Sequence, residues 1–403
     1  MGNAKKRNIV SSPTGRQARI RKDDRIYCME TIGLILIGIT MLFGNLIRIP
    51  LGSVAIYPHE ILMAIFVIGK SIAILKKRKN SWISIPHIYP VLAILFSMAV
   101  SLVLALEKLS VVHVGISSLY LVRFALYAGM FISIWFSSHK QKKNIRTGLL
   151  FFGLFYGALG LFQFFLYPNI RNLMYLGWDP HEWRLTGTLL DPNFSGVLLV
   201  LSLIHLYWMQ MTKQVGKFST ASIWGSYIVQ IVAVACTFSR SAIIALLSVG
   251  ILYIFVYKKW KIAGVILVVA LCTAYIPGLS GTQKIWRMDT SMARVANWNE
   301  GWKAVQSAPL FGVGYNTLQF VRPLENNMSN ARSGFDSSIL TIVATTGILG
   351  ISAWMWFFIS VVKKKNESTV TLLAILISSL FINALFYPWI LLWFFITLAT
   401  EEQ

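Results

Sequence analysis

Long apolar segments separated by short polar ones make up most of this 403-residue chain. At about 1.5 Å of rise per residue, each forms a helix that crosses most or all of a bilayer. The segments are residues 31–47, 59–75, 88–106, 115–136, 148–167, 188–209, 222–237, 241–257, 262–277, 336–362, 369–386 and 388–400. The pattern predicts an all-α polytopic integral membrane protein with about twelve transmembrane helices. Pro388 either separates the last two as short helices or kinks a re-entrant segment.

The same pattern divides the chain into four parts. These are a basic tail (1–30), a bundle of about nine spans (31–277), a large polar loop (278–335) and the carboxyl-terminal spans (336–403). Within the loop, residues 290–306 place Arg294, Trp298 and Trp302 at helical spacing. We therefore expect an amphipathic helix with its tryptophans at the membrane interface.

Composition and charge agree with a membrane protein and give its orientation. The chain is 56% hydrophobic with a mean hydropathy of +0.64, and its formal net charge is +22. With the amino terminus inside, the cytoplasmic segments carry 24 of the 37 Lys and Arg, and the outer segments carry 11. This asymmetry predicts a multi-pass protein of the cytoplasmic membrane with both termini in the cytoplasm, and it makes nucleic acid an improbable partner. Residues 168–187, 237–241 and 278–335 then share the extracytoplasmic face.

Three arginines stand out by their positions relative to the apolar segments. Arg184 precedes the sixth segment, and Arg240 occupies a polar turn between Ser239 and Ser241. Arg123 lies inside the fourth segment, where an arginine costs roughly 2.5–3.5 kcal/mol to insert and should face a polar cavity or a bound anion. The plainer alternatives are a solvated side chain for Arg184, a headgroup anchor for Arg240 and a structural partner for Arg123.

Polar residues also mark the predicted outer ends of two helices. Asp191, Pro192 and Asn193 break the start of the sixth segment, and Asp336 begins the tenth. An aspartate at such a position is often only a helix N-cap, particularly when proline follows it.

A metal site is the weaker interpretation of the acidic residues nearby. Asp179, His181 and Glu182 resemble a ligand cluster, but their spacing fits no standard site. We therefore predict no metal and no other cofactor.

Several outward arginines and one carboxylate suit the transfer of a sugar from a lipid diphosphate. The leaving diphosphate gains negative charge, which guanidinium groups stabilise by binding its oxygens bidentately. A carboxylate can take the proton of the attacking hydroxyl. Arg294 and Arg287 of the large loop add to the cations that supply the first function.

At these residues the sequence resembles the superfamily of O-antigen ligases and Wzy-type O-antigen and capsular polysaccharide polymerases. The resemblance rests on four motifs, which lie at 184–193, 237–241, 294–314 and 336–350. It implies a lipid-sugar glycosyltransferase fold (GT-C-like) and inverting, metal-independent transfer from a polyprenyl-diphosphate-linked oligosaccharide. It also implies that Arg184, Arg240 and Arg294 hold the diphosphate and that Asp336 occupies the position of a base. Ligases tend to have His-Asn there, whereas this chain has Asp336-Ser337, which is similar to many capsule-type polymerases.

The sequence therefore predicts a polysaccharide polymerase of the cell envelope. Asp336 is the candidate catalytic residue, and Arg184, Arg240, Arg294 and Arg123 are candidates for diphosphate binding. Supporting candidates are Asp191, Asn193, Ser239, Ser241 and Arg287. The alternatives are a ligase that moves finished glycan to a terminal acceptor and a transporter or flippase of lipid-linked sugar, which would carry ionisable residues at mid-membrane and two similar halves. Membrane lipids, a flippase and a chain-length regulator are the further partners considered.

Overall fold

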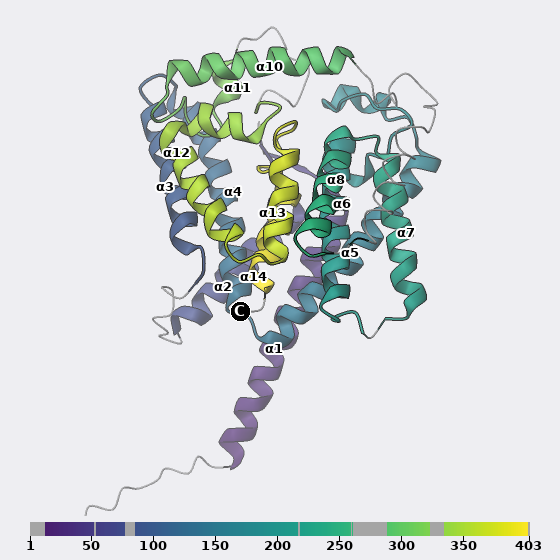
Figure 1. Cartoon of the computed structure of the whole chain (residues 1–403). Helices are drawn as coiled ribbons and strands as arrows, with labels where there is room; N and C mark the ends of the chain where they lie inside the picture. Colours follow the sequence, from purple (N-terminus) through teal and green to yellow (C-terminus); the bar gives the residue numbers. More distant parts are fainter. Residues whose placement is uncertain are drawn as a thin grey trace, which may run out of the picture.

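The computed structural model describes residues 13–51, 54–76, 85–216, 218–258, 260, 288–322 and 334–401, and these are mostly helical (Figure 1). The helices are α1 (Pro13–Leu42), α2 (Pro58–Lys76), α3 (Ile88–Ala105), α4 (Val111–Trp135), α5 (His139–Leu166), α6 (Pro192–Met211), α7 (Thr220–Cys236), α8 (Arg240–Phe255), α10 (Met288–Ser307), α11 (Leu318–Val321), α12 (Ser338–Val362), α13 (Glu367–Ser378) and α14 (Pro388–Thr400). Three short 3-10 helices, η1 (Gly44–Leu46), η3 (Arg171–Leu176) and η4 (Gly187–Leu189), lie in the connections. Strands β1 (Ile49–Leu51) and β2 (Val54–Ile56) form one antiparallel hairpin before α2.

Local sequence sets many of the helix starts. Ser110, Ser138, Ser219 and Asn366 accept a hydrogen bond from the backbone at the starts of α4, α5, α7 and α13. Each satisfies one of the backbone N–H groups that a helix leaves unpaired at its amino end. At α5 the cap is a full capping box, because Gln141 also bonds back to the backbone of the cap residue.

The predicted spans correspond closely to these helices. Within the described residues, six helices are long and apolar enough to cross a membrane: α2, α3, α4, α5, α6 and α12. Shorter apolar helices occupy residues 27–42 and the positions of α7, α8, α13 and α14. The chain is therefore a mostly helical protein of the multi-span membrane class, as predicted. The predicted span 262–277 lies outside the described residues, and the total of twelve stays a prediction.

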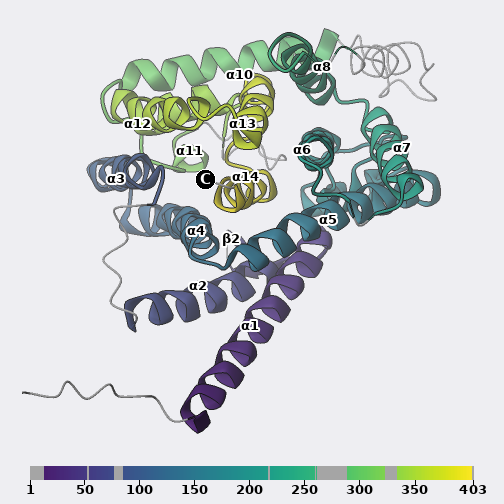
Figure 2. The same ribbon diagram turned by 60° about the horizontal axis from the view of Figure 1, so that its bottom comes forward.

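The carboxyl-terminal helix α14 forms the centre of the bundle (Figure 2). Every residue from Trp389 to Thr400 is buried, and α14 packs against α4, α5, α6 and α13. Pro388 is the first residue of α14, where its missing N–H costs no helical hydrogen bond. The structure has two separate short helices here, α13 and α14, and whether the segment is re-entrant stays a prediction.

A buried charged cluster joins α5, α6 and α13. The Glu367 carboxylate accepts hydrogen bonds from Arg146 at 2.6 Å and from Nδ1 of His205 at 2.5 Å. His205 also donates through Nε2 to the backbone carbonyl of Arg146, and Arg146 Nε donates to Gln214. The buried charges of Arg146 and Glu367 are thus paired, which is the condition for burying them at tolerable cost.

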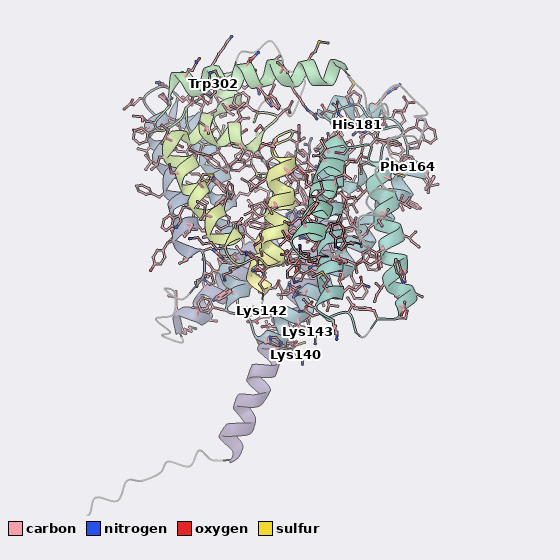
Figure 3. All side chains as sticks on the ribbon, viewed as in Figure 1. Lys140, Lys142, Lys143, Phe164, His181 and Trp302 are labelled. Carbon is pink, nitrogen blue, oxygen red and sulfur yellow. The ribbon has the colours of Figure 1, made fainter. Side chains whose placement is uncertain are left out.

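Helix α10 lies across one end of the bundle (Figure 1). Helical structure here confirms the helix predicted for residues 290–306, and the position of its tryptophans at the membrane interface stays a prediction. Trp302 and His181 lie at this end, which we call the α10 end, and Lys140, Lys142 and Lys143 lie at the opposite end (Figure 3).

The turn that follows α10 is fixed onto α12 by glycines. Gly347 has φ +63° and interrupts α12, and the free backbone groups there pair with the turn, for example Ile348 N–H with the Pro309 carbonyl at 2.9 Å. Gly312, at φ +73°, approaches the α12 backbone so closely that a Cβ would lie 2.1 Å from the carbonyl carbon of Thr345. Only glycine fits both requirements at this position, so the glycine motif serves to hold α10 in place.

Candidate functional site

A cavity of about 620 Å³ lies at the α10 end of the bundle. Its walls come from the β hairpin region, α4, the α5–α6 connection, the starts of α6 and α8, α10, the region before α12, and the α13–α14 connection. The cavity brings together all four arginines and three of the polar residues singled out in the sequence, which are Arg123, Arg184, Arg240, Arg294, Asp191, Asn193 and Asp336. Segments up to 213 residues apart in sequence thus share one site.

Arg240 is presented to the cavity by the start of α8. Ser239 is the N-cap of α8 and accepts a hydrogen bond from the Ala242 N–H. The Ser239 hydroxyl also contacts Ser241 at 3.1 Å and donates to Asn193 Oδ1 at 3.2 Å. Asn193, Ser239 and Ser241, three of the predicted supporting residues, therefore connect the start of α6 to the start of α8, where Arg240 lies.

Arg184 is buried, with 2% of its surface exposed. Its guanidinium donates to the backbone carbonyls of Thr237 at 3.0 Å and Phe238 at 3.3 Å, the two residues before the cap of α8. The alternative of a solvated side chain is wrong for Arg184. It lines the cavity and also supports the turn that carries Arg240.

Asp336 is held at the cavity by its backbone. Its N–H donates to Asn297 Oδ1 at 2.8 Å, and Trp298 of α10 donates to its carbonyl at 3.3 Å. The N-cap of α12 is Ser337, which accepts from the Leu340 N–H, so the alternative of Asp336 as helix cap is wrong. Burial raises the pKa of Asp336, and the positive charges of Arg294 and Arg322 partly oppose this.

Asp191 is the N-cap of α6, as its sequence position predicted. Its Oδ1 accepts from the N–H groups of Asn193 at 2.7 Å and Phe194 at 3.1 Å, and Pro192 begins the helix. Burial raises the pKa of Asp191 despite these bonds. The cap interpretation is confirmed, and the residue contributes to the cavity wall as well.

Arg123 has a structural partner that the sequence did not identify. Its guanidinium pairs with Glu60 at 2.6 Å and donates to the Ala55 carbonyl, and it lies over the rings of Tyr57 and Tyr120. Glu60 also accepts from Tyr127 at 2.7 Å. The alternative of a structural partner is confirmed, although Arg123 also lines the cavity. The sequence did contain a sign of this partner, because Glu60 is the one acidic residue of the apolar segment 59–75.

The acidic residues of the α5–α6 connection are arranged differently from the trio Asp179, His181 and Glu182 that was weighed as a metal site. Glu182 pairs with Arg171, and Asp191 takes its place, so that ligand atoms of Asp179, His181 and Asp191 lie within 4.8 Å of one another. Burial also raises the pKa of Asp179, and its charge disfavours ionisation of Asp191. The absence of a metal cofactor stays a prediction.

Two other arginines bear on the candidate set. Arg287 lies outside the described residues. Arg48 lines the cavity and lies over the ring of Trp178 at 5.0 Å. Arg48 and Trp178 were not singled out in the sequence.

The fold and the cavity define a multi-span membrane protein with a cationic polar site at one end of its helical bundle. Residues 225–355 match the family model described as O-antigen ligase. The matched region contains Arg240, Arg294, Asp336 and the glycine turn that holds α10. The match confirms the resemblance to the O-antigen ligase and Wzy-type superfamily and supports a lipid-linked glycan as substrate. A search of the curated proteins gives no match to the chain.

Proposed function

We propose that the protein is a polysaccharide polymerase that acts on the extracytoplasmic face of the cytoplasmic membrane. It transfers a growing glycan from one polyprenyl diphosphate to the next lipid-linked repeat unit, by inversion and without a metal. The observation that carries this proposal is the meeting of Arg184, Arg240, Arg294 and Asp336, from four separate parts of the chain, around one cavity.

In the proposed mechanism, the arginines bind and stabilise the leaving diphosphate. Arg240 and Arg294 lie close enough that their positive charges oppose each other, which makes a bound anion favourable between them. As the bond from the anomeric carbon to the diphosphate oxygen breaks, the charge gained by that oxygen is stabilised by guanidinium groups already in position. Arg184 contributes from a fixed, buried site, and Arg123 remains a weaker candidate because Glu60 neutralises it.

Asp336 is the proposed general base. Its carboxylate accepts the proton of the acceptor hydroxyl as that oxygen attacks the anomeric carbon. Partial burial raises the pKa of Asp336 and so makes the carboxylate a stronger base than a solvated aspartate. The positive charges of Arg294 and Arg322, the latter paired with Glu300, favour the ionised carboxylate and partly oppose this rise in its pKa.

The ligase alternative shares this chemistry and differs in its acceptor. The description of the matching family favours it, whereas Asp336-Ser337 in place of His-Asn favours the polymerase. Purified protein in lipid nanodiscs, supplied with a defined lipid-linked repeat unit and separately with a non-repeat glycolipid acceptor, tests both. Ladders of lipid-linked polymer support the polymerase, and single transfer to the second acceptor supports the ligase. If neither product forms while the repeat unit crosses a vesicle bilayer, the proposal is overturned in favour of a transporter.

A further inference from the structure

One wall of the cavity carries amide and aromatic side chains and no charge. We call it the amide wall, and its residues are Asn45, Tyr315, Asn316, Asn383, Phe386 and Tyr387. It is formed by η1, the connection after α10 and the α13–α14 connection. The mechanism proposed above uses none of these residues.

Three carboxamides of this wall have polar atoms without a hydrogen-bond partner among the residues that the structure describes. These atoms are Asn45 Oδ1, Asn316 Nδ2 and Asn383 Oδ1, and all three are buried. A buried polar atom is normally hydrogen-bonded, because leaving it unpaired destabilises the fold. Because the three residues line the same cavity, their amides leave hydrogen-bonding capacity there for a polar ligand.

The Asn45 side chain is held in place. Asn45 Nδ2 donates to the Leu189 carbonyl at 2.7 Å and to the Tyr387 hydroxyl at 3.0 Å. These two bonds fix the orientation of the amide, while its Oδ1 has no partner among the described residues. The backbone carbonyl of Asn316 accepts a hydrogen bond from the Ser117 hydroxyl at 3.1 Å. These hydrogen bonds hold Asn45 and the backbone of Asn316 in place before a ligand binds, which lowers the entropic cost of binding.

The amide wall lies directly beside the proposed base. Ser338, two residues after Asp336, donates its N–H to the Ser379 carbonyl at 2.9 Å and accepts from the Leu385 N–H at 3.0 Å. These bonds attach the connection that carries Asn383 to the start of α12. A group bound at Asn383 is therefore next to the position where the acceptor hydroxyl loses its proton.

The chemistry of the wall matches a sugar. Carboxamides both donate and accept, as do sugar hydroxyls, and no ion is needed for the pairing. Aromatic rings supply apolar surface for the C–H faces of a pyranose, and Tyr315, Phe386 and Tyr387 line the cavity. An acidic sugar fits less well, because the wall offers no cation and Asp336 is close.

We infer that the amide wall binds one uncharged sugar residue of the lipid-linked glycan, adjacent to the glycosidic bond that forms. This inference rests on the proposed function and specifies the substrate class of the same site. Asn383 and Asn316 provide the recognition, and the arginines across the cavity bind the diphosphate independently of it.

The test compares three synthetic lipids bound to the full chain in nanodiscs. They are polyprenyl diphosphate alone, the same lipid with a neutral hexose and the same lipid with a hexuronic acid. We expect the wild type to prefer the hexose lipid, and Asn383→Ala and Asn316→Ala each to weaken its binding about five- to tenfold while leaving the bare lipid unchanged. Asn144→Ala is the control, because it removes an exposed amide that bonds to Tyr27 and does not line the cavity. It should change neither the affinity for the bare lipid nor that for the hexose lipid.

The inference is overturned if the two variants weaken bare and hexose lipids equally, or if neither affinity changes. The bare lipid also reports whether a variant is folded. Failure of the proposed function gives a different result. In that case Arg240→Ala leaves the affinity for bare polyprenyl diphosphate unchanged, and this outcome does not depend on the effect of Asn383→Ala on the affinity for the hexose lipid.

Discussion

Replacing Asp336 by asparagine removes the proposed base with little change of shape. The residue is held by its backbone, through Asn297 and Trp298, and neither bond involves its carboxylate. The cap of α12 is Ser337 and stays intact. We therefore expect Asp336→Asn to fold and to bind lipid diphosphate as the wild type does.

The expected loss is in the rate of transfer. General base catalysis contributes about 10²–10⁴-fold, so the initial rate of Asp336→Asn should fall by about 100-fold or more. Transfer requires the ionised carboxylate, and burial raises the pKa of Asp336. The wild-type rate should therefore decline on acidification at a higher pH than the pKa of an ordinary aspartate, and the residual rate of Asp336→Asn should lack this decline.

The assay measures initial rates of polymer formation from a defined lipid-linked repeat in nanodiscs. Ser337→Ala is the matched control, because it keeps the carboxylate and loses the cap, at a stability cost of about 1 kcal/mol. It should retain most of the transfer rate at a temperature where it is folded. If Asp336→Asn keeps more than about a tenth of the wild-type rate, or if Ser337→Ala loses as much, Asp336 is not the base.

Three further changes test other parts of the structure. Arg240→Lys keeps the charge but loses the bidentate fork, and we expect at least about a tenfold loss of transfer rate in the same assay; a wild-type rate would make Arg240 a membrane anchor. Glu367→Ala leaves the buried Arg146 without its carboxylate, and unfolding in detergent should show roughly 3–5 kcal/mol of lost stability, whereas an unchanged midpoint contradicts the cluster. Gly312→Ala should destabilise by more than about 1–2 kcal/mol, because φ is +73° and a Cβ meets backbone at 2.1 Å. Gly115→Ala in α4, with nothing within 4 Å, is its control and should be neutral or stabilising in the same unfolding measurement.

The spans were predictable because apolar runs in lipid have few alternatives to helix. The gathering of arginines was predictable in outline, since Arg184, Arg240 and Arg294 all fell on one predicted face. Their roles differ, however, in ways that depend on tertiary contacts. Arg184 supports the turn before α8, and Arg123 is paired with a carboxylate 63 residues away.

Other features depend on atomic detail that no pattern carries. Whether Asp336 or Ser337 caps α12 is decided by the backbone angles at a single residue, and both residue types are good caps. The central position of α14 follows from its partners, because an apolar stretch has the same composition whether it faces lipid or protein. The amide wall was missed for the same reason, since isolated asparagines in loops are common in any sequence.

The charged cluster at the start of α13 has a consequence for how this protein is made. At 12 residues, α13 rises about 18 Å, well short of the roughly 30 Å of hydrocarbon in a bilayer, and it begins with a glutamate. Such a segment inserts poorly by itself. Its partner Arg146 precedes it by 221 residues, so α5 and α6 leave the ribosome long before α13 does. The residues that pair with Glu367 are therefore already present in the chain when α13 is synthesised.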